Sequence, residues 1–341
     1  MHNPTLKDLP PPPAGKTGWP WTVESLSLSD RMPDGAPWPR LSIVTPSYNQ
    51  GQFLEETIRS VLLQGYPNLE YIIIDGGSTD NSVEIIQEYA PWLTNWVSEP
   101  DRGQAHALNK GFARCTGDLL SWINSDDTLL PNAVGHLASA FKRFPFAILL
   151  GHVLNFDEIR GRKWQIRQRD VTREKMTQPW QYGVTWHQPG TYFPHALYYQ
   201  VGSFDETLRY WFDWDWMCRA LRVAKGHYLQ EPIAQFRYHE ASKTVGEAGE
   251  WFSEKRVVAK RYWPRRIAAD AQLAEAVQEI LRAETYLLFY SRDRNKALHH
   301  LSRAFLHDYH VLKWRRYWLL FLKALLPVRM LHLLRVCLRG F

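Results

Sequence analysis

Two neighbouring carboxylates, Asp126 and Asp127, follow a short apolar run in the middle of the chain. The run, Leu119–Ile123, is short for a helix and is typical of a buried strand. Adjacent carboxylates repel each other unless a cation or hydrogen-bond donors lie between them, and a hard divalent metal would supply that cation. The alternative is a solvated turn, or a cap for the helix that begins near Pro131. Taken alone the pair favours the turn, so its surroundings must decide.

Polar and acidic clusters also follow three earlier segments that are predicted to be strands. Apolar runs at residues 41–45, 69–74 and 95–98 alternate with helical patterns, which predicts parallel strands joined by helices. The clusters that follow the four runs are Thr45–Asn49, Asp75–Asp80, Asp101–Arg102 and Asp126–Asp127. Because parallel strands end at the same edge of a sheet, we expect these clusters to form one ligand site.

Three polar residues in the second half of the chain are further candidates. Asp213 lies at the predicted start of a helix, where it could cap the helix or, in a cleft, act as a general base. Gln188 precedes a predicted strand and is a candidate contact to a sugar or an acceptor. His239 follows the last predicted strand, at residues 233–238. It could close over a diphosphate or a metal, or simply lie on the surface.

Length and composition indicate a large globular protein. The 341 residues are 45% hydrophobic, enough to bury a substantial core in one or two domains. Three widely separated cysteines support neither a disulfide framework nor a cysteine zinc site. The N-terminus lacks the apolar core of a signal peptide, and no stretch reaches the roughly 18 to 20 apolar residues that span a bilayer. A cytoplasmic location fits these features best.

Positive charge is concentrated toward the C-terminus, where Arg, Lys and His are frequent from Trp251 onward. Residues 311–341 interleave basic residues with Trp314, Trp318 and Phe321. This pattern predicts either a helix in a membrane interface, where lipid-linked acceptors are found, or a helix that packs on the rest of the protein. A membrane helix would place the protein at the inner face of the cell membrane. Nothing in the pattern favours binding to nucleic acid.

Six motifs, taken in order between about Arg40 and Lys243, resemble those of the family 2 glycosyltransferases, which have the GT-A fold. They are Ser42–Asn49, Ile74–Asp80, Asp101–Gly103 with Ala107–Gly111, Asn124–Asp127, Val201–Glu206 and Asp213–Asp215. The fourth is similar to the metal-binding DxD motif, and the last to the acidic motif whose first carboxylate is the usual catalytic base. Two positions depart from the family pattern: Asn124 begins the DxD-type motif, and Phe212 stands where many relatives carry an acidic residue.

The resemblance implies an α/β fold with a GT-A-type, Rossmann-like and mostly parallel sheet flanked by helices. We expect this domain at residues 40–245, after an N-terminal extension at 1–39 and before a C-terminal helical extension at 246–341. The implied activity is inverting, metal-dependent transfer of a single sugar from a nucleotide-diphosphate sugar, with a UDP-sugar favoured. The acceptor would be a hydroxyl of a saccharide or lipid-linked saccharide in surface polysaccharide or glycolipid synthesis.

The resemblance also implies roles for single residues. Asp213 would be the catalytic base, and Mg²⁺ or Mn²⁺ would be held by Asp127, Asp126 and His239. Residues that would contact the nucleotide-sugar are Thr45, Pro46, Tyr48, Asn49, Asp75, Arg102, Asp126 and Gln188. Trp211 and Trp214 could either face the sugar or belong to the core.

Two other functions are compatible with parts of this pattern. A nucleotidyltransferase that forms a nucleotide sugar shares a related sheet, but it needs a Gly-rich loop with a basic residue where Thr45–Asn49 stands. A non-catalytic nucleotide-sugar binder would not need Asp126, Asp127 and Asp213 together. The lack of membrane spans and of a Gln-x-x-Arg-Trp pattern favours single-sugar transfer over processive synthesis.

Overall fold

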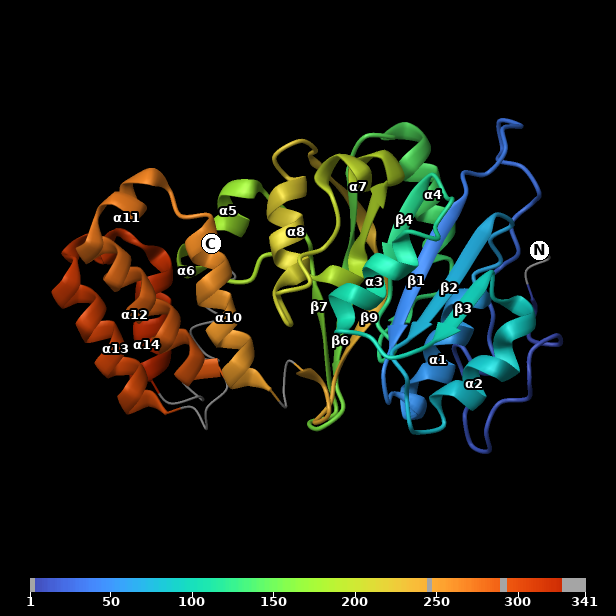
Figure 1. Ribbon diagram of the computed structural model, residues 1–341, viewed down its shortest axis with the longest axis horizontal. Coiled ribbons are helices and arrows are strands. Elements are labelled where there is room, and N and C mark those ends of the chain that lie inside the picture. Colours follow the sequence, from blue (N-terminus) through green and yellow to red (C-terminus); the bar gives the residue numbers. More distant parts are fainter. Residues whose placement is uncertain (1–3, 244–246, 289–292, 327–341) are drawn as a thin grey trace. The chain divides into compact units, whose positions relative to one another are not determined.

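The computed structural model describes residues 4–243, 247–288 and 293–326 (Figure 1). These residues form two compact units. The first contains the chain up to Thr172 together with Trp186–His239, and it holds all of the predicted site residues. The second contains Arg173–Thr185 and the chain from Glu240 onward. The domain boundaries after residues 39 and 245 stay a prediction.

A mixed sheet forms the centre of the first unit (Figure 1). Its strands are β1 (Leu41–Ser47), β2 (Leu69–Asp75), β3 (Asn95–Ser98), β4 (Leu119–Trp122), β5 (Thr128–Leu129), β6 (Ile148–Asp157), β7 (Arg162–Ile166), β8 (Thr191–Pro194) and β9 (Gly226–Tyr238). They lie in the order β3-β2-β1-β4-β8-β6-β9-β5, with β7 paired to β6. The strands β1 to β4 are parallel, whereas β8 is antiparallel to both β4 and β6. The predicted α/β class is therefore confirmed.

The four parallel strands end at one edge of the sheet, as predicted. Ser47 lies beside Asp75 in the register, and Asp75 lies beside Ser98. Val44 is paired with Trp122, so β4 ends close to the same edge. The helices of this unit are α1 (Gly51–Leu62), α2 (Ser82–Tyr89), α3 (Gln104–Phe112), α4 (Ala133–Arg143), α7 (His195–Val201) and α8 (Phe212–Ala220). The helix α3 packs closely on the sheet because Gly111 faces Val44 and Ile74, where a Cβ atom would have no room.

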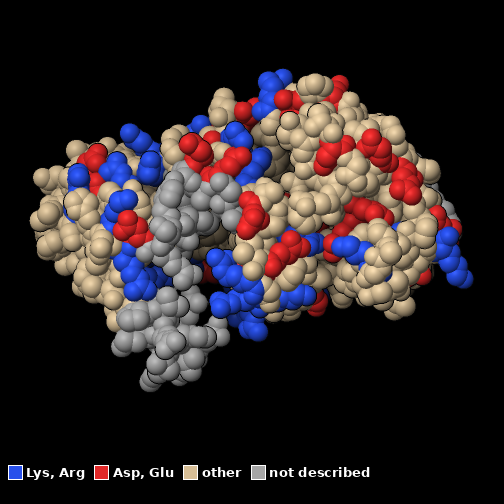
Figure 2. Space-filling view, turned by 90° about the horizontal axis from the view of Figure 1, so that it is seen from below, with Lys and Arg blue, Asp and Glu red and all other residues tan. Residues whose placement is uncertain are grey.

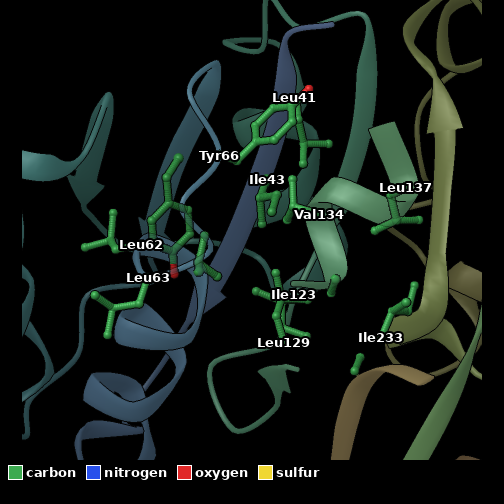
Figure 3. Packing of buried hydrophobic residues seen from close by; sticks show 14 of the residues in the cluster. Leu41, Ile43, Leu62, Leu63, Tyr66, Ile123, Leu129, Val134, Leu137 and Ile233 are labelled. Atoms are coloured by element: carbon green, nitrogen blue, oxygen red, sulfur yellow. The ribbon is translucent and has the colours of Figure 1, made fainter. Parts of the chain in front are cut away.

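The apolar core of the first unit holds both ends of the Asp126–Asp127 turn. In Figure 3, side chains of β1, α1, α4 and β9 point into one cluster of buried residues. Ile123, just before the turn, and Leu129, just after it, belong to this cluster and are almost completely buried. Burying a side chain of this size stabilises a fold by about 1.5 to 3 kcal/mol. The carboxylates are thus carried by a turn with little freedom to move.

The N-terminal segment is irregular but packed. Its residues Leu9, Met32 and Trp38 belong to the same buried cluster as β1 and α1. The buried guanidinium of Arg59 on α1 donates hydrogen bonds to the carbonyl oxygens of Pro10, Pro20 and Trp21. These hydrogen bonds give the buried guanidinium backbone oxygens as acceptors, and they hold the N-terminal segment against α1.

The second unit is helical, with a core of its own. Its helices are α5 (Arg173–Thr177), α6 (Pro179–Tyr182), α10 (Ala248–Arg261), α11 (Arg265–Ala269), α12 (Ala271–Leu288), α13 (Arg294–His307) and α14 (Arg315–Leu325). The segment 155–181 contains the β6–β7 hairpin followed by α5 and α6. Trp180 of α6 is buried in the core formed by the C-terminal helices. The predicted membrane segment is described only as far as residue 326, and its remainder lies outside the described residues.

Candidate active site

The turn that carries Asp126 and Asp127 is fixed by its own backbone and by a threonine of α1. The amide of Asp127 donates to the carbonyl oxygen of Asn124 at 3.0 Å. The hydroxyl of Thr57 lies 2.9 Å from the carbonyl oxygen of Ser125 and 2.7 Å from that of Asp127. The buried side chain of Thr57 thus holds two carbonyl groups of the turn. No sequence pattern had indicated this role for Thr57.

Arg237 of β9 joins the turn to the sheet. Its amide donates to Asp127 Oδ1 at 2.9 Å, and its Nε donates to the carbonyl oxygen of Asp126 at 3.0 Å. Its guanidinium also pairs with the carboxylates of Glu56 and Glu158. Sequence reasoning missed this residue, although its place near the end of a strand, two positions before His239, was an available signal. Arg237 brings positive charge next to two carboxylates that would otherwise repel each other.

Asp126 and His239, two of the three predicted metal ligands, lie together. His239 Nε2 is 3.0 Å from Asp126 Oδ2, and the His239 ring packs against Phe53 with the ring centroids 4.4 Å apart. The third predicted ligand, Asp127, is only 1% exposed and accepts hydrogen bonds from the Arg237 amide and from Asn124 Nδ2. Within the described residues, no group of three or more His, Cys, Asp or Glu side chains is arranged to hold a metal ion.

The electrostatics of the turn suit a cation. Burial raises the pKa of Asp127 well above its usual range, and the nearby charge of Asp126 raises it further. The hydrogen bonds from Arg237 and Asn124 offset only part of this effect. Mg²⁺ is commonly held by one or two carboxylates, with water and substrate phosphate completing its shell. The carboxylates of Asp126 and Asp127 are ligands of the type that such an ion takes, although among the described residues they are not grouped with His239 as a three-ligand site.

Asn124 connects the turn to two glutamines. Its Nδ2 lies 3.2 Å from Asp127 Oδ2 and 3.5 Å from Gln188 Oε1, and its Oδ1 accepts a hydrogen bond from Gln104 Nε2 at 2.7 Å. Gln188 in turn donates from Nε2 to the carbonyl oxygen of Trp122 at 2.8 Å. The structure therefore brings Gln188 to the turn that carries Asp126 and Asp127. The asparagine that departs from the DxD pattern supplies a donor to Asp127, which an aspartate could not do.

The loops after β1 and β2 hold each other in place. Asp75 is buried and accepts hydrogen bonds from the amides of Gly77 and Ser78 and from the hydroxyls of Ser78 and Ser98. Asn49 adopts a left-handed backbone conformation, and its Oδ1 accepts from the amide of Thr79 at 2.8 Å. Asp75 therefore uses its carboxylate oxygens to hold the loop after β2 in shape and to join that loop to the end of β3.

The other residues that are predicted to contact the nucleotide-sugar differ in their exposure to solvent. Tyr48 is 60% exposed at the edge of the sheet. Thr45 and Pro46 are buried in β1, and the Thr45 hydroxyl lies 3.0 Å from the hydroxyl of Tyr71. Arg102 is exposed and pairs with Glu206, which joins the motif after β3 to the segment Val201–Glu206 before α8, here called the connector. Of these residues, Tyr48 and Arg102 present side chains that a ligand could reach directly.

Asp213 is the second residue of α8, as the sequence predicted, and it is partly exposed. Its neighbours Trp211 and Trp214 are buried, with ring centroids 4.8 Å apart, so their indoles belong mainly to the core. Asp215 is also buried and pairs with Arg219 at 3.0 Å. Asp213 is thus the carboxylate of this motif that reaches solvent, at a helix N-terminus where negative charge is favoured.

Arg219 uses its remaining donors on the connector before the helix. Its Nη1 donates to the carbonyl oxygen of Val201 at 2.7 Å, and its Nη2 donates to that of Ser203 at 2.9 Å. Together with the Asp215 pair, these bonds hold the start of α8 against the connector. The position of Asp213 therefore depends on Asp215 and Arg219.

Comparison with known proteins identifies the family. The family model described as "Glycosyl transferase family 2" matches residues 42–206. An uncharacterized glycosyltransferase of Mycobacterium tuberculosis (strain ATCC 25618 / H37Rv) is 30% identical over 205 residues, which cover 58% of this chain and 75% of the relative. The chain belongs to glycosyl transferase family 2. The predicted resemblance and class of enzyme are confirmed, and the family favours a glycosyltransferase over a nucleotidyltransferase.

Two further matches have lower sequence identity. An uncharacterized glycosyltransferase of Rickettsia typhi is 27% identical over 217 residues, which cover 60% of this chain and 66% of the relative. The fold is similar to that of S. aureus TarS residues 1–349, solved in complex with UDP-GlcNAc, with a TM-score of 0.54. That match has 17% identity and covers 84% of this chain and 79% of TarS 1–349. At this identity the likeness shows the GT-A fold alone.

Proposed function

We propose that this glycosyltransferase moves a single sugar from a nucleotide-diphosphate sugar to an acceptor hydroxyl, with inversion at the anomeric carbon. The observation that carries the proposal is the contact between the ends of β4 and β9, where Asp126, Asp127, Arg237 and His239 meet. Membership of the family supports a sugar transferase. The UDP-GlcNAc bound to TarS, a protein of similar fold, supports a nucleotide-sugar donor, and we favour a UDP-sugar.

Residues at the ends of β1, β2 and β3 would bind the nucleotide. Tyr48, with its exposed ring, would contact the base or ribose, while Thr45, Pro46 and Asn49 shape the loop beneath it. Asp75 is our candidate for the edge of the base, where an N–H group of the nucleotide would replace one of its present donors. Arg102, also exposed, would approach the diphosphate or the base.

Asp126, Asp127 and His239 would hold Mg²⁺ or Mn²⁺, which when bound supplies positive charge to the leaving diphosphate. Asp213 would take the proton from the acceptor hydroxyl as its oxygen bonds to the anomeric carbon. The bond between that carbon and the diphosphate oxygen breaks in the same step, and a single displacement inverts the configuration. Gln188, held beside Asn124, would position the transferred sugar or the acceptor.

A donor assay tests this proposal. The purified protein is incubated with UDP-, GDP- and TDP-sugars in Mn²⁺ or in EDTA, and release of nucleoside diphosphate is measured. We expect slow release from at least one donor, with water as acceptor, and loss of that release in EDTA. If no donor is consumed or bound under any condition, the proposed function is wrong.

We also propose that the second unit contacts a membrane through α14, which would bring the site to lipid-linked acceptors in surface polysaccharide or glycolipid synthesis at the inner face of the cell membrane. One side of α14 is buried in the helical core through Tyr317 and Leu320, whereas Trp318, Leu322 and Leu325 are exposed. Figure 2 shows several groups of Lys and Arg side chains on the second unit. Exposed apolar side chains beside basic residues are typical of helices that lie in an interface. Among the described helices, none has the length and apolar character needed to cross a bilayer.

Removing two exposed leucines should weaken membrane binding. In the variant Leu322→Ser/Leu325→Ser we expect about tenfold weaker binding to vesicles that contain anionic lipid, because about 1 to 2 kcal/mol of apolar transfer is lost. Flotation of the full chain measures the effect. Phe146→Ser, which removes an exposed ring of the first unit, is the control and should leave binding unchanged. Equal flotation of the double variant and the wild type would rule out contact through this face.

A further inference from the structure

Four rings lie in a row on the part of the sheet formed by β7, β6 and β9. The register pairs Trp164 with Asn155 and Asn155 with Phe236, which places these side chains on one face. Trp164 stacks on Tyr238 with the ring centroids 5.4 Å apart and the ring planes 25° apart. Phe236 contacts Tyr238 at 4.8 Å and His187 at 6.3 Å. We call Trp164, Tyr238, Phe236 and His187 the aromatic strip.

The strip is not simply part of the core. Trp164 is 40% exposed, and Tyr238, Phe236 and His187 are only partly buried. A row of aromatic faces that water can reach suits a ligand with apolar ring faces and polar edges. Sugar rings have this character, since their C–H faces stack on aromatic rings while their hydroxyls point outward.

The hairpin that carries Trp164 is strongly basic. Between Ile159 and Arg169 the chain has Arg160, Arg162, Lys163, Arg167 and Arg169, and it has no acidic residue. Arg160 pairs with Asp157, but no salt bridge forms on Arg162, Arg167 or Arg169 from any residue that the structure describes. Unpaired positive charge beside the strip complements a ligand that carries negative charge.

The strip adjoins the candidate active site at its His187 end. His187 immediately precedes Gln188, which donates to the carbonyl oxygen of Trp122 and lies beside Asn124. Tyr238 immediately precedes His239, which contacts Asp126. A chain lying on the strip would therefore have one end at the predicted reaction centre and the remainder along β7.

We propose that the aromatic strip binds the acceptor, and that the acceptor is a saccharide chain bearing negative charges. This inference rests on the proposed function and adds the acceptor class to it. The sugar rings stack on Trp164 and its neighbours, while Arg162, Arg167 and Arg169 attract the anionic groups. Uronate carboxylates and phosphodiesters both carry negative charge, so the test includes a saccharide with each kind of group. A single-stranded nucleic acid also stacks and carries charge, and the test includes it as a competing outcome.

Binding to the full chain is measured by titration with oligosaccharides of equal length in the absence of donor. The set contains oligogalacturonate, a phosphorylated oligosaccharide, neutral maltohexaose and single-stranded DNA. We expect at least one anionic saccharide to bind at least tenfold more tightly than maltohexaose and more tightly than DNA. The variant Trp164→Ala should weaken that binding about tenfold, whereas Tyr199→Ala, which removes an exposed ring of α7, should not change it. The double variant Arg162→Gln/Arg167→Gln should weaken binding and lower its dependence on salt.

The inference is overturned if DNA binds more tightly than every saccharide, or if Trp164→Ala and the wild type bind saccharide equally. It is also overturned if the wild type binds a nucleotide-sugar but none of the anionic saccharides. Donor affinity of Trp164→Ala is measured in parallel and should match the wild type, because Trp164 lies outside the proposed donor site. Failure of the wild type to bind any donor would instead count against the proposed function.

Discussion

Asp213→Asn abolishes sugar transfer and leaves donor binding nearly intact. An amide is isosteric with the carboxylate but cannot accept the proton of the attacking hydroxyl. Loss of a general base typically costs about 10² to 10⁴ in rate. The measurement is the release of nucleoside diphosphate at saturating donor, together with the dissociation constant of the donor from calorimetry.

Asp215→Asn provides the matched comparison, because Asp215 belongs to the same motif but is buried against Arg219. This change should loosen the bonds of Arg219 to the connector and lower the melting temperature, whereas Asp213→Asn should not. If Asp213→Asn loses donor binding in parallel with activity, Asp213 contacts the donor and another group is the base.

Glu284→Gln destabilises the helical unit by about 3 to 5 kcal/mol, the usual cost of removing one partner from a buried ion pair. Glu284 is 1% exposed on α12, where it accepts a hydrogen bond from Lys255 Nζ at 2.8 Å and pairs with Arg316. The glutamine would remove the carboxylate charge that Lys255 and Arg316 share. Hydrogen exchange of the α12 amides measures the change in opening free energy. Glu275→Gln, an exposed position on the same helix, should shift it by less than about 0.5 kcal/mol.

The same pair makes stability depend on pH. Burial alone would raise the pKa of Glu284, but the charges of Lys255 and Arg316 and their hydrogen bonds lower it to about 2. The unfolded value is about 4.3, so the folded state holds fewer protons between these values. The stabilisation is therefore complete above pH ~4.3 and is lost as the pH falls toward ~2. The difference between the wild type and Glu284→Gln should shrink over this range, and a constant difference would show that the charge of Glu284 is not responsible.

The first half of the fold could be predicted because local pattern and tertiary structure agree there. The strands β1, β2 and β4 are buried apolar runs, whereas β3 is a partly exposed strand at the edge of the sheet, and each of the four is followed by polar residues. A parallel arrangement then brings the polar residues to one edge whatever the packing details. The contact between Asp126 and His239 also agrees with the sequence pattern, because each residue comes just after a predicted strand.

Tertiary contacts decide the parts that the sequence did not indicate. The strand β7 is charged, and only its pairing with β6 makes it a strand. β9 begins at Gly226 rather than at Ile233, because pairing with β6 extends it through a polar segment that contains Pro232. The burial of Trp211 and Trp214, the use of Asp75 within its own loop and the role of Arg237 all depend on contacts between distant segments. Contacts of this kind produce no periodic pattern in the sequence, so they could not be predicted from it.

The most direct test of the proposed activity is a calorimetric titration of a UDP-sugar into the wild type and into Asp126→Asn, each with Mn²⁺ and with EDTA. Asp126 contacts His239 at the end of β4, so its charge should matter only when a cation joins the donor to the turn. We predict that the wild type binds at least tenfold more tightly with Mn²⁺, and that Asp126→Asn binds weakly and equally under both conditions. Binding that is the same in both proteins and indifferent to Mn²⁺ would contradict the account.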